Sequence, residues 1–330
     1  MTGQKQTKYV LIILAIVGGT VFLGCAGCAG LLFWVAQPPQ ASAQAREPFH
    51  PEAVPVPTML PRGTSEQWAE GVECYEIALG PGGGFYDPPG HGGSLWLYLP
   101  SGEHEPKSLP CVLIAGAGSP MFCGMPLGDG DRPEHIPYVE AGFAVIAYEM
   151  DGPWGDEDSD DQMGRAYEAF RDAQAGVVNA RNALEYALRR VPEIDPNRIF
   201  AAGHSSAGSA ALLFAAHEPR LAGVVAYAPC YDVTKHLGGM LRILAIQCDG
   251  IADFAVQSSP KTHEARIQCP VFLFHASGDQ VCDIEDSQAA EARMQALGID
   301  VTLATTAGGD HYNPMINDGI FRAIEWMQQH

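Results

Sequence analysis

The sequence has little positive charge and little cysteine. Lysine and arginine together number 19 among 330 residues, against 39 aspartates and glutamates, so the formal net charge is −20 at pH 7. A strongly acidic surface repels phosphate backbones, which excludes nucleic acid as an expected partner. Nine cysteines in so long a chain exclude a disulfide scaffold, and 47% hydrophobic residues exclude a disordered chain.

Motifs for cofactors are missing as well. The sequence contains no phosphate-binding loop, no dinucleotide fingerprint and no cluster with metal-ligand spacing. The acidic run at residues 156–161 offers oxygen ligands of the kind that Ca²⁺ prefers, but it lacks the spacing and the glycine of an EF-hand. A solvated acidic loop before a helix is the favoured interpretation, and we expect neither a metal nor a cofactor.

The first 36 residues lack acidic side chains and are mostly apolar. Residues 9–36 form a run of 28 residues without charge, preceded by Lys5 and Lys8. As a helix this run would reach about 42 Å, more than the roughly 30 Å of a bilayer core, so it predicts a transmembrane anchor over residues 1–36. The two lysines favour a cytoplasmic N-terminus and a body outside the cell membrane.

Two other fates of this segment stay open. The Ala-Ser-Ala at residues 41–43 resembles a signal-peptidase site, which would release a secreted protein. The apolar run is, however, longer than the roughly 7–15 residues usual in signal peptides. Residues 22–25, ending at Cys25, faintly resemble a lipoprotein box.

Proline marks the border of the soluble part. Residues 37–64 hold seven prolines, which predicts a semi-rigid tether followed by one domain over residues 65–330. The domain holds seven cysteines, so at least one thiol stays free, and the sequence does not pair the others. It does not give the oligomeric state either.

The domain alternates short β-branched runs with amphipathic helical stretches. This pattern predicts an α/β domain with a mostly parallel, twisted sheet covered by helices on both faces. Residues 231–268 fit the rhythm poorly and are interpreted as a cap insertion. A single long helix is expected over residues 161–191, ended by Pro192. The eight expected strands lie at residues 72–79, 94–99, 111–115, 143–148, 199–202, 223–227, 271–274 and 300–304.

One short motif carries the chemistry. Ser205 follows an expected strand and precedes an apolar helix, with Gly203 two residues before it and Ala207 two residues after. A serine at the apex of such a strand–turn–helix is a nucleophile elbow, in which the backbone passes too close for large side chains. Ala207 stands where glycine is usual, and Gly208 lets the helix approach the strand.

Two later residues complete a possible triad. Asp279 follows the strand at 271–274, and His311 follows the strand at 300–304, in the chain order Ser, Asp, His. His311 would take the proton of Ser205, and Asp279 would orient the imidazole and stabilise its charged form. Asp310, next to His311, is an alternative acid. His204, next to the nucleophile, is interpreted as structural.

Backbone N–H groups would stabilise the oxyanion. The Ser206 N–H lies at the start of the helix after the nucleophile, where the helix dipole favours negative charge. The second donor is expected in the small-residue loop after the strand at 111–115, and the Ala117 N–H is the candidate.

These motifs resemble the α/β-hydrolase superfamily, in particular its prolyl oligopeptidase-like and dienelactone hydrolase-like branches. The similarity covers roughly residue 110 to the C-terminus and rests on residues 194–208 and on Cys269-Pro270-Val271, which lead to Ser205 and Asp279. It implies Ser205, Asp279 and His311 as nucleophile, acid and base. Ala115, where these enzymes often carry His, and Ala207 depart from the pattern.

The sequence therefore predicts a membrane-anchored serine hydrolase outside the cytoplasm that cleaves carboxylic esters through an acyl-enzyme. A peptidase related to prolyl oligopeptidase, acting on short peptides, is the alternative within the same chemistry. From a different class, an inactive binding protein tethered to the surface could share the fold. Small-molecule esters or short peptides are the expected substrates.

Overall fold

A nine-stranded mixed sheet forms the centre of the protein. The computed structural model describes residues 41–79, 93–155 and 158–330, so the expected anchor at 1–36 lies outside the described residues. The strand order is β1-β2-β3-β5-β4-β6-β7-β8-β9; β1, β2, β3 and β5 pair antiparallel, and the pairs from β5 to β9 are parallel. The strands are β1 (Glu66–Ala69), β2 (Val72–Leu79), β3 (Gly93–Pro100), β4 (Leu109–Ala115), β5 (Ala144–Tyr148), β6 (Ile194–His204), β7 (Gly223–Tyr227), β8 (Val271–Ala276) and β9 (Val301–Thr306).

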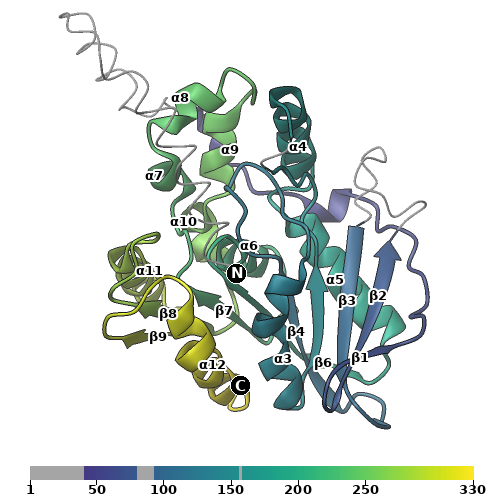
Figure 1. Ribbon diagram of the computed structural model, residues 1–330. Coiled ribbons are helices and arrows are strands. Elements are labelled where there is room, and N and C mark those ends of the chain that lie inside the picture. Colours follow the sequence, from purple (N-terminus) through teal and green to yellow (C-terminus); the bar gives the residue numbers. More distant parts are fainter. Residues whose placement is uncertain (1–40, 80–92, 156–157) are drawn as a thin grey trace, which may run out of the picture.

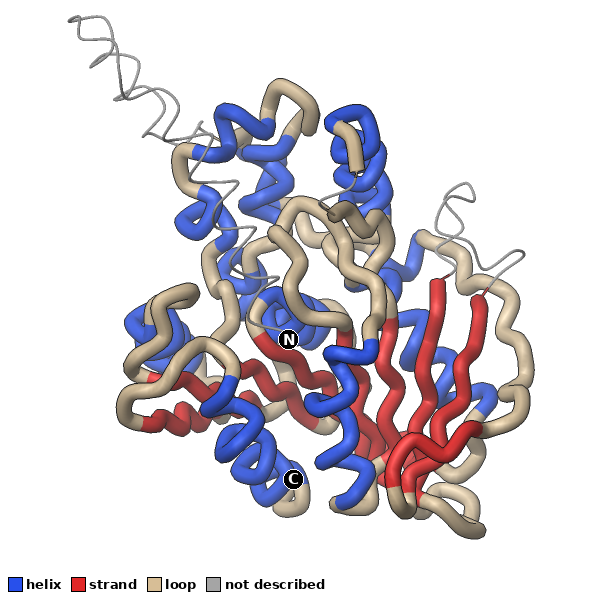
Figure 2. The backbone as a smooth tube through the Cα atoms, in the orientation of Figure 1, coloured by secondary structure: helices blue, strands red, loops and turns tan. Residues whose placement is uncertain are grey.

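Helices cover both faces of this sheet, as Figure 2 shows. The larger helices are α3 (Arg132–Glu140), α4 (Asp160–Asp172), α5 (Val177–Arg190), α6 (Ser206–Ala215), α11 (Ile284–Ala296) and α12 (Ile320–Met327). The shorter ones are η1 (Ala43–Arg46), η2 (Pro51–Ala53), η3 (Asp129–Asp131), α7 (Val233–Leu237), α8 (Met240–Leu244), α9 (Ile251–Gln257), α10 (Pro260–His263), η4 (Glu264–Arg266) and η5 (Met315–Gly319).

The alternation of side chains along each strand makes two hydrophobic cores. In β4, Cys111 and Leu113 point into the core beneath α5, α6 and α11, whereas Val112 and Ile114 point into the core beneath α3 and α12. Successive side chains of a strand face opposite sides of the sheet, so continuous apolar runs suit strands buried on both faces. The seven described cysteines are all buried and unpaired.

The sequence interpretation of the secondary structure needs two corrections. It missed β1, a short and mostly exposed edge strand whose composition is not apolar. It also expected one helix over residues 161–191, where the structure has α4 and α5. Gln174, Ala175 and Gly176 between them all have positive φ, at 56°, 56° and 84°, and such backbone ends a right-handed helix.

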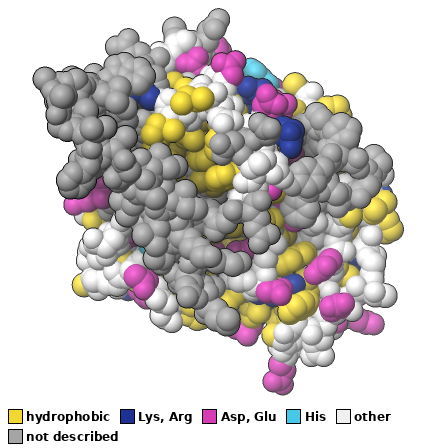
Figure 3. Space-filling view, turned by 45° about the horizontal axis from the view of Figure 1, so that its top comes forward, with side chains coloured by type: hydrophobic (Ala, Val, Ile, Leu, Met, Phe, Trp, Pro, Cys, Tyr) yellow, Lys and Arg dark blue, Asp and Glu magenta, His cyan; other side chains and the backbone are white. Residues whose placement is uncertain are grey.

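A group of short helices lies over one end of the sheet. Helices α7, α8 and α9 stand at the top of the molecule beside α4 (Figure 1), within the range interpreted as a cap. Phe254 of α9 packs edge-on against Tyr167 and Phe170 of α4, with ring centroids 5.5 and 5.7 Å apart. Figure 3, with this end turned forward, shows hydrophobic side chains gathered between scattered acidic ones.

Residues 41–64 pack against the domain, although this range was assigned to a tether. The backbone N–H and hydroxyl of Ser42 donate to the Asp253 carboxylate of α9 at 2.6 and 2.8 Å. Arg181 of α5 donates to the carbonyls of Pro51 and Val54, both at 2.7 Å. This segment, which we call the strap, therefore joins the cap to the helical layer. The strap is too short for hydrophobic periodicity in the sequence to predict these contacts.

Within residues 41–79, 93–155 and 158–330, no helix combines the length and the apolar character needed to cross a bilayer.

The strap is expected to contribute to the stability of the whole domain. Phe49 is 8% exposed, and its ring lies 6.0–6.5 Å from those of His217, Phe254 and His263. Phe49→Ala should lower the free energy of unfolding by about 3 kcal/mol, because it removes a buried ring and leaves a cavity. Urea unfolding of the full chain measures this loss. Leu60→Ala is the control, since Leu60 is 44% exposed, and an equal loss there would contradict the prediction.

Candidate active site

Ser205 lies on a strained turn between β6 and α6. Its φ and ψ are 55° and −120°, and its N–H donates to the carbonyl of Tyr227 at 2.8 Å. A Cβ on Gly203 would lie 2.4 Å from the carbonyl carbon and oxygen of Ala207, so only glycine fits there. Positive φ on a serine is costly and is kept where the surrounding structure enforces it. The strand–turn–helix that the sequence predicts is therefore present.

An aspartate and a histidine meet across two loops at the carboxyl ends of β8 and β9. The Nδ1 of His311 lies 2.6 Å from Oδ2 of Asp279, and both side chains are buried. The other carboxylate oxygen accepts the N–H groups of Val281 and Cys282 at 2.7 and 3.1 Å. The loops of the predicted acid and base thus come together, 32 residues apart in the sequence.

The surroundings keep Asp279 ionised. Burial alone would raise the pKa of Asp279, but hydrogen bonds from His275, His311 and the backbone outweigh it and hold the pKa well below the usual range. An ionised carboxylate at Nδ1 makes Nδ1 the protonated ring atom of a neutral His311. The lone pair is then on Nε2, the atom that a general base uses here.

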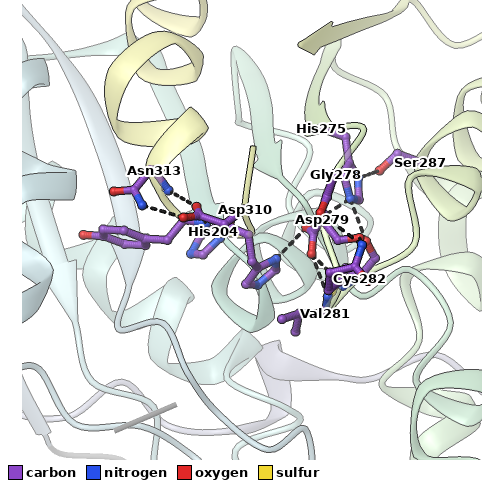
Figure 4. Close-up of polar contacts among 12 residues, drawn as sticks. His204, His275, Gly278, Asp279, Val281, Cys282, Ser287, Asp310 and Asn313 are labelled. Atoms are coloured by element: carbon purple, nitrogen blue, oxygen red, sulfur yellow. Dashed lines mark hydrogen bonds and ion pairs between the residues drawn. The ribbon is translucent and has the colours of Figure 1, made fainter. Parts of the chain in front are cut away.

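The acid has a second histidine partner that the sequence interpretation missed. Nε2 of His275 lies 2.9 Å from the carbonyl of Cys282 and 3.3 Å from Asp279, and its Nδ1 lies 2.7 Å from the Ser287 hydroxyl (Figure 4). A carbonyl only accepts, so Nε2 of His275 carries the hydrogen and donates it to Cys282, close beside the carboxylate. The position of His275 at the end of β8, four residues before Asp279, was the available signal.

The alternative acid is engaged elsewhere. Asp310 accepts the N–H groups of Tyr312 and Asn313 at 3.0 and 2.7 Å and also the Asn313 side chain (Figure 4). These bonds close the turn after His311. Asp279, and not Asp310, therefore holds the imidazole.

The elbow and the base are joined through His204. Its Nε2 lies 2.8 Å from the carbonyl of His311, and the two rings are 4.5 Å apart. Nε2 of His311 is buried and makes no hydrogen bond with any described residue, Ser205 included. In enzymes without substrate, such bonds are often long and tighten only in the substrate complex.

The loop after β4 is fastened to the start of α6. The N–H groups of Gly118 and Ser119 both donate to the Ser206 hydroxyl at 3.0 Å. Ala117 is half-buried, and within the described residues its N–H donates to no acceptor. The loop thus stands beside the residue that follows the nucleophile, and the Ser206 side chain was a link that the sequence motif did not reveal.

A carboxyl group lies buried behind the elbow. Glu134 of α3 is 4% exposed, and its Oε1 lies 4.0 Å from Nδ1 of His204. Burial raises the pKa of Glu134 to about 8, with a smaller contribution from Asp131. One turn further along α3, the hydroxyl of Tyr138 bonds that of Tyr227 at 2.5 Å, and Tyr227 also supplies the carbonyl that holds Ser205.

Among the described residues, no group of three or more His, Cys, Asp or Glu side chains could hold a metal ion.

Comparison with known proteins gives a family and several related folds. The model of the prolyl oligopeptidase family matches residues 135–330. Among curated proteins, none matches the sequence. An acetyl xylan esterase from Paenibacillus sp. R4 has a similar structure, with a TM-score of 0.59 and 16% identity, over 90% of this chain and 99% of that one.

Two further similar structures are those of proteins named for other activities. An acylaminoacyl peptidase from Pyrococcus horikoshii has a TM-score of 0.54 and 17% identity over 72% of this chain, but only 38% of its own length is covered. A putative dienelactone hydrolase from Klebsiella pneumoniae has a TM-score of 0.54 and 18% identity, over 72% of this chain and 93% of that one. At these identities the likeness establishes the α/β-hydrolase fold alone.

Glu134 makes stability depend on pH in a defined direction. Between about pH 4.5 and 8 the unfolded chain releases the Glu134 proton while the folded chain retains it, so its burial costs more stability as the pH rises. Glu134→Gln should therefore stabilise the protein more at pH 8 than at pH 5, by up to a few kcal/mol. Urea unfolding at both pH values measures the difference.

The matched control is Glu103→Gln, because Glu103 is exposed. Its effect should be small and the same at both pH values. An equal effect of Glu134→Gln at pH 5 and pH 8 would show that the buried carboxyl is not protonated.

Proposed function

Because this chain belongs to the prolyl oligopeptidase family of serine hydrolases, we propose that it cleaves carboxylic esters through an acyl-enzyme formed on Ser205. The observation that carries this proposal is the contact of 2.6 Å between His311 and an Asp279 that is held ionised, with the His311 loop bonded to His204 of the strained serine turn. Such a base is built to accept a proton at Nε2.

The proposed reaction has two halves. Ser205 attacks the acyl carbon while its hydroxyl proton moves to Nε2 of His311, and the charged imidazole is stabilised by Asp279. His311 then gives this proton to the leaving alcohol oxygen, which departs as the acyl-enzyme forms. In the second half a water molecule, deprotonated by His311, attacks the acyl carbon. The bond from the acyl carbon to Oγ of Ser205 then breaks, the carboxylic acid leaves, and the proton returned by His311 restores the Ser205 hydroxyl.

Backbone groups would stabilise the negative oxygen of each tetrahedral intermediate. The Ser206 N–H stands at the beginning of α6, and the Ala117 N–H stands in the loop that Ser206 itself fastens. The Ser206 hydroxyl accepts hydrogen bonds from two N–H groups of this loop and so fixes its position. The two proposed oxyanion donors are therefore held in place before the negative charge develops. Preorganised donors of this kind are worth about 10²–10³-fold in rate each.

Esters are favoured over peptides by the extent of the structural likeness. The acetyl xylan esterase matches this chain over nearly its full length, whereas the acylaminoacyl peptidase matches over 38% of its own. Family membership supports the peptidase as the second candidate, with short peptides as substrates. An inactive binding protein of the same fold is disfavoured, since family membership and the ionised acid beside the base both support catalysis.

The location of the enzyme is part of the proposal. The uncharged run at residues 9–36, after Lys5 and Lys8, supports a single anchor with the N-terminus in the cytoplasm and the hydrolase domain outside the membrane.

Labelling with a fluorophosphonate tests the nucleophile. The wild type should be labelled, and Ser205→Ala should not. Ser205→Ala and His311→Ala should each lose about 10⁴–10⁶-fold in ester turnover, and Asp279→Ala should lose somewhat less. Ser42→Ala is the control, since the Ser42 hydroxyl belongs to the strap and donates to Asp253 of α9. Labelling of Ser205→Ala equal to that of the wild type would refute the assignment.

A substrate panel separates the ester from the peptide activity. Short-chain nitrophenyl esters should be turned over faster than aminoacyl-arylamides, compared by kcat/KM on the same preparation. A higher value for the arylamides would reverse the order of the two candidates while leaving Ser205 as the nucleophile. Absence of both, with the fluorophosphonate label also absent, would favour the inactive protein.

A further inference from the structure

His204 does more than pack in the core, because it also contacts the proposed base, His311. It is 2% exposed and stands immediately before Ser205, at the end of β6. Its ring lies 4.5 Å from the ring of His311 and 5.6 Å from that of Tyr312, and its Nε2 lies 2.8 Å from the carbonyl of His311. The sequence interpretation of His204 as purely structural did not foresee these contacts.

The carbonyl settles the protonation of His204. A carbonyl oxygen only accepts, so Nε2 of His204 is the donor. Burial, followed by the nearby His311, lowers the pKa of His204 to about 3, so the ring is neutral at working pH. The groups that face it are Glu134 from α3, His275 and Asp279 from the end of β8, and His311 and Tyr312 from the loop after β9.

The loop that carries His311 needs such an anchor. It begins with Gly308 and Gly309, whose φ values are 68° and 82°, so its backbone has more freedom to lose than ordinary residues. Asp279 holds the His311 ring at Nδ1 but does not bond the His311 backbone. The hydrogen bond from His204 holds that backbone from the side of the nucleophile.

We propose that His204 is a positioning residue for His311: by donating Nε2–H to the His311 carbonyl, it ties the base loop to the nucleophile elbow and keeps the base within reach of Ser205. This inference rests on the proposed roles of Ser205 and His311. The geometry of the elbow requires a small residue at Gly203 but no histidine at position 204, so the donor itself is the feature to test.

Three substitutions of His204 separate the donor from the volume. His204→Gln places an amide N–H near the position of Nε2 and keeps the bond. His204→Asn carries the same amide on a side chain one carbon shorter, which does not reach the His311 carbonyl. His204→Leu fills much of the space without any donor.

The measurement is kcat and KM for a short-chain nitrophenyl ester, with the thermal midpoint of each full-chain variant. His204→Asn and His204→Leu should lose about 10- to 100-fold in kcat with KM changed by less than about threefold, because a displaced base impairs the chemical step. His204→Gln should recover kcat to within about fivefold of the wild type, since its amide restores the donor.

His263 offers a matched control. It is 3% exposed, and its Nε2 lies 3.0 Å from the carbonyl of Gln257, so it makes the same kind of bond within the cap. His263→Leu should lower the thermal midpoint and leave kcat within about twofold, because it removes a buried bond that does not touch the base.

Two results would overturn the proposal. One is a kcat for folded His204→Asn equal to that of His204→Gln, and the other is a loss of kcat in His263→Leu as large as in His204→Leu. If His204→Leu fails to fold, the comparison of Gln with Asn decides. Either result together with an inactive Ser205→Ala refutes this inference alone, whereas an active Ser205→Ala refutes the proposed function.

Discussion

The hydrogen bond between Asp279 and His311 is the interaction on which the site depends. A buried carboxylate is costly, and here two histidines and two backbone N–H groups surround it, so the charge is retained at neutral pH. That charge selects the tautomer of His311. The loops after β8 and β9 have to be adjacent for this bond to form, and the parallel pairing of the two strands places their carboxyl ends together.

The opposite side of the site is held by neutral groups. His204, Glu134 and the pair Tyr138–Tyr227 lie behind the elbow, in the core beneath α3 and α12. Because Glu134 stays neutral, this side adds no negative charge near His311, and Asp279 is the carboxylate that bonds the ring. With one side ionised and the other neutral, the protonated form of the His311 imidazole is favoured, and the neutral side offers no carboxylate that would compete for the proton.

Much of this arrangement could be predicted from the sequence. The strands β2 and β7 have the predicted bounds, and the order Ser205, Asp279, His311 is visible because each residue follows a predicted strand, here β6, β8 and β9. The place of His275 before Asp279 hinted at a role, but the contacts that His275 and His204 make could not be predicted, since a histidine at the end of a strand has the same local pattern whether it packs or binds a partner. The break at Gln174–Gly176 escaped because two of its three residues are not glycine.

The strap sets a limit on how far the chain can be shortened. A version that starts at Ser65, the domain boundary expected from proline content, would remove the partner of Asp253 and strip Phe49 from the rings of α9 and α10. The helices above the catalytic end would then present bare apolar surface to water. A trimmed enzyme for crystallisation or kinetics should therefore begin no later than residue 41, and assays on shorter forms would report on an altered cap.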